Sequence, residues 1–252
     1  MIERAEPHRP APPPDPARGL TLLLIGPPAS GKGTQARLLA ETGWQHLAVG
    51  RLVRHEIRRG TALGRQLAVA SESGRMSSDE LVLPLVAEAL AATDPGASLV
   101  VDGAPARMSQ VGALEAMLAD HGRRPDLVVV LDVPPAELRH RVAERRSCPL
   151  CERTFGASEA RCPADGAPLT RRKEDRPRPF ERRLRTYESE LAPVVERYEQ
   201  TTTVARVDGS APVEAVAHAL HAALTRRSAV DASARGATGR RASTATSLIS
   251  DV

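Results

Sequence analysis

The sequence predicts an α/β fold in which a five-stranded parallel sheet lies between two layers of helices. Short apolar runs alternate with longer amphipathic stretches along most of the chain, which is typical of strands joined by crossover helices. The run at 127–131 is apolar throughout, as expected for a strand that is covered on both faces. A glycine-rich turn also separates the first apolar run from the helix predicted after it.

The expected elements alternate within one domain at 19–227. We expect strands at 20–25, 98–102, 127–132 and 203–207, with a further short strand at 46–48. We expect helices at 31–43, 50–59, 62–73, 78–92, 108–121, 134–146, 180–200 and 212–226. Residues 1–18 are rich in Pro, Arg and Ala, and residues 228–252 consist mainly of Ala, Ser, Thr, Arg and Gly. Both segments are therefore expected to be disordered.

The composition argues against several classes of protein. Hydrophobic residues make up 41% of the chain but aromatic residues only 2%, so Leu, Val, Ile and Ala must fill the core. No run approaches the roughly 18 apolar residues of a membrane span, and the first residues lack an apolar signal segment. The net charge of +4 comes without a Lys-rich arm, so we expect neither a membrane nor a nucleic acid as a partner.

A phosphate-binding loop is predicted between the strand at 20–25 and the helix after it. The segment reads GPPASGKGT and contains the GxxxxGK pattern in a strand–loop–helix context. Its glycines let successive N–H groups point into one hollow, and the helix N-terminus and Lys32 add positive charge. The candidate nucleotide-binding residues are Gly26, Pro27, Ala29, Ser30, Gly31, Lys32, Gly33 and Thr34.

Two positions in this loop bear on its chemistry. Lys32 and Lys173 are the only lysines in a chain with 35 Lys and Arg residues, and the compact charge of Lys32 suits phosphate. Gly33 stands where a general phosphate-binding loop has Ser or Thr. The usual hydroxyl ligand for Mg²⁺ is therefore missing from that position, and Thr34 follows it.

A metal site is predicted where the three cysteines cluster. Cys148-Pro-Leu-Cys151 is followed, after ten intervening residues, by Cys162-Pro-Ala-Asp165. Two such knuckles supply four ligands for a tetrahedral Zn²⁺ and leave no open position, so the metal is expected to be structural. An odd number of clustered cysteines also argues against a disulfide framework and fits a reducing cytoplasm.

From the phosphate-binding loop onward, the chain resembles adenylate kinases and related nucleoside monophosphate kinases, in which GKGT replaces GK[ST]. The resemblance covers roughly 20–226 and includes the cysteine cluster, because zinc-bearing bacterial members carry a Cys-rich lid. It implies a P-loop three-layer sandwich with two mobile insertions: an acceptor clamp at 49–78 and a zinc lid at 147–172. It also implies transfer of the γ-phosphoryl group of Mg²⁺-ATP to AMP. Because two insertions that close over the substrates need no partner subunit, we expect a monomer. The family usually has Gly where this chain has Ala29.

The resemblance further implies roles for individual residues. The implied catalytic residues are Lys32, Asp102, Arg141 and Arg172, with Asp102 holding Mg²⁺ through water. Arg141 and Arg145 are implied to contact ATP, whereas Arg54 grips the acceptor phosphate and Gln110 reads the acceptor base. The full set implied on the acceptor side is Gly50, Arg54, Gly103, Arg107, Gln110, Arg172 and Arg182.

The chain departs from the family pattern on its acceptor side. Val49 replaces a Thr and offers no hydroxyl to a base, and Arg51 replaces an Asp and reverses its charge. Ala106 stands in place of a phosphate-binding arginine. Arg107 lies one residue later and substitutes for it only if the loop shifts.

A second departure follows the lid, where Glu181 stands at a position assigned to a further catalytic arginine, with Arg182 and Arg183 beside it. Four functions remain open. They are an active AMP kinase, a same-fold kinase for another acceptor, an ATP-binding regulatory protein without catalysis, and a zinc-ribbon nucleic-acid module. Arg107 and Arg182 facing the acceptor phosphate favour an enzyme, and Glu181 pointing inward favours the regulatory protein.

Overall fold

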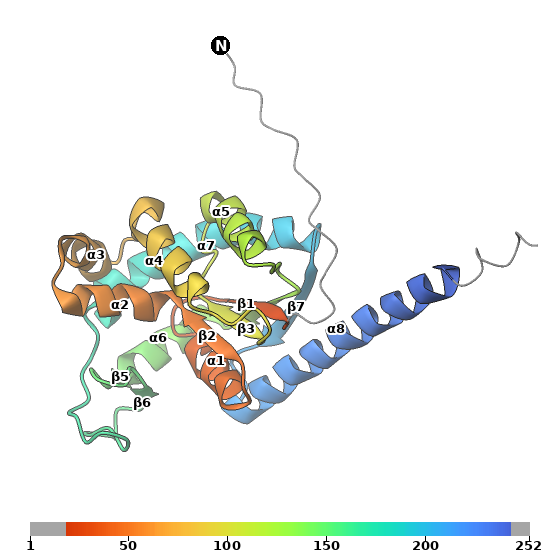
Figure 1. Ribbon diagram of the computed structural model, residues 1–252. Helices are drawn as coiled ribbons and strands as arrows, with labels where there is room; N and C mark the ends of the chain where they lie inside the picture. Colours follow the sequence, from red (N-terminus) through yellow and green to blue (C-terminus); the bar gives the residue numbers. More distant parts are fainter. Residues whose placement is uncertain (1–18, 243–252) are drawn as a thin grey trace, which may run out of the picture.

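The computed structural model describes residues 19–242 and centres on a five-stranded parallel sheet (Figure 1). Its strands are β1 (Thr21–Ile25), β2 (Gln45–Ala48), β3 (Leu99–Asp102), β4 (Leu127–Asp132) and β7 (Thr203–Asp208). They lie in the order β2-β3-β1-β4-β7, so the predicted fold class and the short strand near 46–48 are confirmed. The expected leader at 1–18 and the last ten residues of the expected tail lie outside the described residues.

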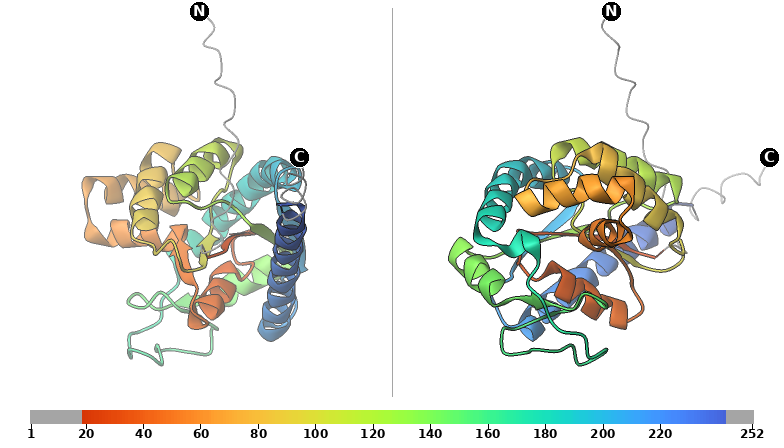
Figure 2. Two further views of the ribbon diagram at one scale, coloured as in Figure 1. Left: turned by 45° about the vertical axis from the view of Figure 1, so that its right-hand side comes forward. Right: turned by 90° about the vertical axis from the view of Figure 1, so that its left-hand side faces the viewer.

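Helices cover both faces of this sheet (Figure 2). They are α1 (Lys32–Glu41), α4 (Asp79–Ala91), α5 (Met108–Asp120), α7 (Pro177–Glu199) and α8 (Val213–Ala242). Because side chains alternate along a strand, Leu22 and Leu24 of β1 pack in one core cluster with residues of α1 and α8. Leu23 and Ile25 pack in another with residues of α4, α5 and α7. The all-aliphatic strand thus has an apolar layer on each side.

The register of the strands brings three loops together at the carboxyl edge of the sheet. Leu24 of β1 pairs with Asp102, and Ala48, the last residue of β2, also pairs with Asp102. The loop after β1 and the start of helix α2 (Val49–Arg59) therefore lie on either side of Asp102. Ligands of parallel α/β sheets bind at this edge.

The segment predicted to be the acceptor clamp consists mainly of α2 and α3 (Ala62–Ser73). Gly60 ends α2 in a left-handed conformation with φ 66°, and Thr61 caps α3 by accepting a hydrogen bond from the backbone N–H of Gly64. These two residues make a sharp turn, so the two helices pack against each other beyond the edge of the sheet.

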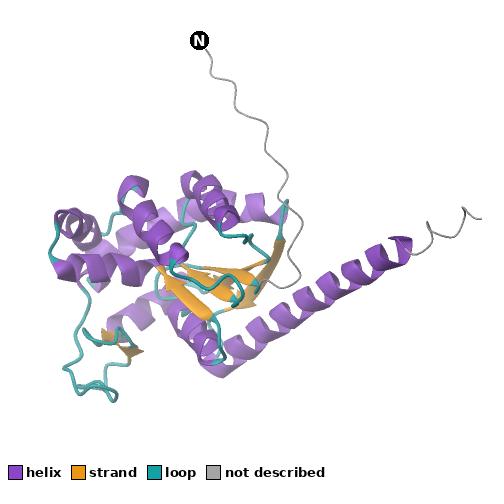
Figure 3. Cartoon of the chain, viewed as in Figure 1, coloured by secondary structure: helices purple, strands orange, loops and turns teal. Residues whose placement is uncertain are grey.

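The lid lies between α6 (Pro135–Glu144) and α7 and is mostly loop (Figure 3). Its regular structure is one antiparallel pair, β5 (Arg146–Ser147) and β6 (Thr154–Phe155), followed by a single 3₁₀ turn at Lys173–Asp175. Leu138 and Val142 of α6 pack on Phe180 and Leu184 of α7, and Ala29 contacts this cluster. The base of the lid is thereby fixed beside the phosphate-binding loop.

Two helix boundaries differ from the sequence prediction by three residues or more. Helix α7 begins at Pro177 rather than at residue 180, because proline suits the first turn of a helix, where its missing N–H costs nothing. Helix α8 continues to Ala242, past the predicted end at 226, so residues 228–242 are helical rather than disordered, and the helix projects away from the sheet (Figure 1). No helix within residues 19–242 is both long and apolar enough to cross a membrane.

Candidate active site

A large cleft of about 1500 Å³ opens at the carboxyl edge of the sheet. Its walls come from the phosphate-binding loop, the start of the acceptor clamp, the loop after β3, and the lid with its two flanking helices. Most of the residues singled out from the sequence line it. They are Gly26, Ala29, Ser30, Gly31, Lys32, Gly33, Thr34, Gly50, Arg54, Asp102, Gly103, Arg107, Gln110, Arg141, Arg145 and Arg172.

The phosphate-binding loop is held in a tight turn around the Lys32 ammonium group. Lys32 Nζ donates hydrogen bonds to the carbonyl oxygens of Gly26 at 2.6 Å and Pro27 at 2.8 Å. Gly31 has φ 96° and Ala29 has φ 70°, so the methyl group of Ala29 is accommodated in the left-handed region. Burial lowers the pKa of Lys32 to about 8. The Asp102 carboxylate opposes this change, whereas the charges of Arg183 and Arg145 add to it.

Asp102 lies across from this loop. A Cβ atom added at Gly33 would be 3.5 Å from Asp102 Oδ2, so the carboxylate faces the first turn of α1. His46, in the neighbouring strand β2, is nearly buried, and its Nε2 lies 3.6 Å from the same oxygen. The carboxylate therefore lies between this imidazole and the predicted phosphate site.

Arginines from both ends of the lid line the predicted donor side of the cleft. Arg141 donates hydrogen bonds to Glu137 at 2.7 Å and to the carbonyl of Gly209 at 2.8 Å, whereas Arg172 donates to the Ser147 hydroxyl at 2.8 Å. Burial, together with the charges of Arg54 and Arg145, lowers the pKa of Arg172 to about 9, so it still carries its charge at neutral pH.

The predicted acceptor side of the cleft is built around Arg54. A Cβ atom at Gly50 would lie 3.1 Å from Arg54 Nη1, so glycine leaves room for this guanidinium. Arg54 donates from Nε at 3.0 Å and from Nη2 at 2.8 Å to one carboxylate oxygen of Glu152, a lid residue that the sequence did not single out. The pKa of the Glu152 carboxyl lies below its usual range. Burial alone would raise this pKa, but the charges and hydrogen bonds of Arg54 and Arg58 outweigh the effect of burial.

The loop after β3 contributes the remaining acceptor-side residues. Arg107 lines the cleft beside the clamp and pairs with Asp79 at 3.3 Å. The side-chain amide of Gln110 donates to Asp79 at 2.7 Å and accepts from the backbone N–H of Ala106 at 2.8 Å. Val49 is buried and Arg51 exposed, and both line the cleft. The hydroxyl that Val49 lacks is therefore missing from the wall of the cleft where the acceptor is predicted to bind.

The residues after the lid require a correction. Arg182 is exposed and lies outside the cleft, in a shallow depression between α3 and α7. Glu181 also lies outside it and is paired with Arg139 through a 2.7 Å hydrogen bond. The cleft is lined instead by Arg183. Burial lowers the pKa of Arg183, and its Nη1 is buried without a hydrogen-bond partner among the described residues.

The apolar pattern of α7 bears on which of the residues after the lid faces the cleft. The buried face of α7 includes Phe180, Leu184, Leu191, Val194, Val195 and Tyr198. Arg183 follows Phe180 by three residues and precedes Tyr187, another cleft residue, by four. Side chains at these spacings share one face of a helix, so the apolar periodicity puts Arg183 beside Tyr187 and puts Arg182 on the opposite side of α7. Glu181 precedes the buried Leu184 by three residues, so the spacing alone does not separate it from Arg183.

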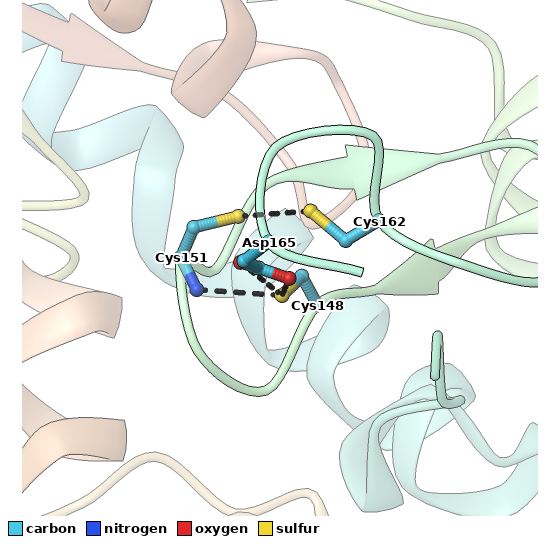
Figure 4. A group of neighbouring side chains, drawn as sticks. All are labelled: Cys148, Cys151, Cys162 and Asp165. Carbon is cyan, nitrogen blue, oxygen red and sulfur yellow. Dashed lines mark hydrogen bonds between the residues drawn. The ribbon is translucent and has the colours of Figure 1, made fainter. Parts of the chain in front are cut away.

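The predicted metal ligands converge in the lid (Figure 4). The ligand atoms of Cys148, Cys151, Cys162 and Asp165 all lie within 4.8 Å of one another. The Sγ atoms of Cys151 and Cys162 are 3.5 Å apart, and Cys148 Sγ is 3.1 Å from an Asp165 oxygen. In a tetrahedral site with ligands at 2.0–2.3 Å, neighbouring ligand atoms are about 3.3–3.8 Å apart. Three thiols and one carboxylate at these distances can hold a metal ion.

Comparison with known proteins agrees with this arrangement. The family model "Adenylate kinase" matches residues 24–203. The adenylate kinase of Moorella thermoacetica is 36% identical over 214 residues, which cover 82% of this chain and 99% of that protein. The adenylate kinase of Pelobacter propionicus is 35% identical over 204 residues, covering 78% and 93%, and that of Kosmotoga olearia is 30% identical over 204 residues, covering 78% and 95%. The chain therefore belongs to the adenylate kinase family.

Proposed function

We propose that this protein catalyses the reversible transfer of the γ-phosphoryl group of Mg²⁺-ATP to AMP, giving two ADP. The observation that carries this proposal is the convergence of Lys32, Arg54, Arg145, Arg172 and Arg183 on one cleft. Nη1 of Arg183 is especially informative, because it is a buried donor that has no hydrogen-bond partner among the described residues and belongs to a side chain lining the cleft. Phosphate oxygens on a bound nucleotide pair supply such a partner.

The proposed step needs positioning and charge neutralisation more than covalent chemistry. The acceptor phosphate is already an anion, so no general base is required. Its oxygen forms a bond to the γ-phosphorus as the bond from that phosphorus to the β,γ-bridging oxygen breaks. Lys32, Arg172 and Arg183 stabilise the charge of the transferring group, and Arg54 aligns the acceptor phosphate. Closure of the lid excludes water and so prevents hydrolysis.

Magnesium is proposed to enter with ATP, where it neutralises charge on the β- and γ-phosphates. Asp102 would hold it through water, and the orientation of its carboxylate toward the first turn of α1 supports this role. The Cys148–Asp165 cluster is proposed to bind Zn²⁺, which would hold the two lid knuckles together. These are separate sites with separate chemistry.

A second candidate is transfer to another nucleoside monophosphate, favoured by the buried Val49 in the acceptor wall. A regulatory protein without catalysis is disfavoured, because Glu181 lies outside the cleft and Arg183 lines it. A monomeric state, a cytoplasmic location and the absence of nucleic-acid and membrane partners stay predictions.

The test is a coupled assay of ADP formation from Mg²⁺-ATP with AMP, CMP, UMP, GMP or dAMP in turn. A Lys32→Ala variant measured in parallel controls for contaminating kinases. Lys32-dependent turnover with AMP supports the main proposal, and turnover with another acceptor alone supports the second candidate. ATP binding without turnover on any of the five rejects both.

A further inference from the structure

The side chain of Glu152, in the lid, contacts the acceptor clamp. One of its carboxylate oxygens accepts both hydrogen bonds from Arg54, and the other lies 2.6 Å from Arg58 Nη1. Arg54 and Arg58 are four residues apart in α2 and so share a face of that helix. The Glu152 side chain is only 7% exposed, compared with 25% for Arg54. The largely desolvated Glu152 carboxylate thus joins two separate insertions in a three-residue ion cluster, in which Arg58 is 43% exposed.

The backbone at Glu152 is unusual for this residue type. It directly follows Cys151 and has φ 59°, in the left-handed region that a non-glycine residue occupies at a cost of about 1 kcal/mol or more. Its N–H bonds to the carbonyl of Cys148, so it closes the first metal knuckle. The knuckle therefore fixes the direction from which this carboxylate approaches α2.

The partner that Glu152 engages is the guanidinium proposed to bind the acceptor phosphate. Arginine binds carboxylates and phosphates through the same planar set of N–H donors. Nε and Nη2 of Arg54 are both committed to Glu152. A phosphate cannot accept hydrogen bonds from these two donors while the carboxylate is in place, and the two anions also repel each other.

We propose that Glu152 is a specificity-determining residue that competes with the acceptor phosphate for Arg54, so that the lid must release α2 before the acceptor binds. This inference rests on the proposed function, which assigns the acceptor phosphate to Arg54. The apparent acceptor affinity is then the intrinsic affinity reduced by the fraction of molecules in which Arg54 is free. An acceptor with a doubly charged phosphate displaces Glu152 more readily than a singly charged anion does.

The kinetic test compares Glu152→Gln with the matched variant Glu159→Gln. Glu159 is another lid glutamate at the rim of the cleft, and its side chain forms no ion pair with the described residues. Glu152→Gln should lower the KM for AMP by about three- to tenfold and change the KM for ATP by less than about twofold. Glu159→Gln should change neither. An unchanged or raised AMP KM in Glu152→Gln overturns the proposal.

A second measurement tests the competition between Glu152 and the acceptor phosphate independently of the proposed phosphoryl transfer. Hydrogen–deuterium exchange of residues 148–165 is followed in zinc-loaded protein with and without AMP or inorganic phosphate. In the wild type, either anion should accelerate exchange in the lid as Glu152 leaves Arg54. In Glu152→Gln, exchange should be fast without added anion. If the wild type shows no phosphoryl transfer yet responds in this way, the competition stands while the proposed reaction fails. Lid exchange that is the same in both proteins and insensitive to anions rejects the competition.

Discussion

Arg145 and Asp175 join the two ends of the lid across a buried contact. Arg145 Nε donates to Asp175 Oδ2 at 2.8 Å, and its Nη2 donates to the other carboxylate oxygen. Asp175 is fully buried and the Arg145 side chain is 16% exposed. Arg145 follows the end of α6, and Asp175 ends the 3₁₀ turn before α7. The pair therefore fixes the base of the lid and holds Arg145 at the donor side of the cleft.

Replacement of Asp175 by Asn should destabilise the protein strongly, because it leaves the Arg145 charge buried without its counter-ion. Such losses cost about 3–5 kcal/mol. The matched control is Asp132→Asn, which breaks an exposed pair with Arg206 and should cost less than about 1 kcal/mol. Denaturant unfolding of both variants measures the difference, and equal costs would show that the buried pair contributes no more than the surface one.

Binding of ATP should be accompanied by proton uptake at Lys32. In the free protein burial holds the pKa of Lys32 at about 8, so at pH 8 about half of the molecules carry a neutral amine. Phosphate oxygens favour the ammonium form and raise this pKa. Titration calorimetry in two buffers of different ionisation enthalpy should therefore detect about half a proton taken up at pH 8 and little at pH 6.5.

The control for this experiment is Lys32→Met, which removes the titrating amine but keeps a side chain of similar length. The difference between the wild type and Lys32→Met isolates Lys32 from the titration of ATP itself. A proton number that is the same at pH 8 in both proteins would place the uptake elsewhere.

Arg183 and its neighbour Arg182 offer a matched pair for catalysis. Arg183→Ala should lower kcat/KM by about 10- to 100-fold, as expected for loss of one or two charged hydrogen bonds of about 1.5–3 kcal/mol. Arg182→Ala removes the same charge from an exposed position and should change kcat/KM by less than about twofold. Steady-state kinetics on the two variants shows which arginine acts in the reaction. A larger loss of kcat/KM in Arg182→Ala than in Arg183→Ala would contradict the role given to Arg183.

Removal of the lid metal should destabilise the lid. Cys162→Ser takes one thiolate from the cluster, so bound zinc and Tm should both fall. Asp165→Cys keeps four ligands and should retain zinc, because four thiolates also form a stable tetrahedral site. Elemental analysis and thermal unfolding test both variants. Retention of stoichiometric zinc by Cys162→Ser would show that the cluster is not the metal site.

Sites formed by contiguous motifs could be predicted from the sequence, whereas contacts that depend on how the helices and the lid pack could not. The phosphate-binding loop and the cysteine knuckles are contiguous motifs, so their residues converge as expected in the cleft and the cluster. The direction of Arg183 instead depends on the apolar face of α7, which a motif comparison ignored in favour of Glu181 and Arg182. The contact between Glu152 and Arg54 joins residues 98 positions apart, and no local pattern indicates it.

The most direct test of the proposed reaction follows the label from [γ-³²P]ATP in the presence of Mg²⁺ and unlabelled AMP. The reaction predicts radioactive ADP, at a rate abolished by Lys32→Ala and reduced by Arg183→Ala but unaffected by Arg182→Ala. Label found only in ATP or in inorganic phosphate, in protein that still binds ATP, would contradict phosphoryl transfer to AMP at this cleft.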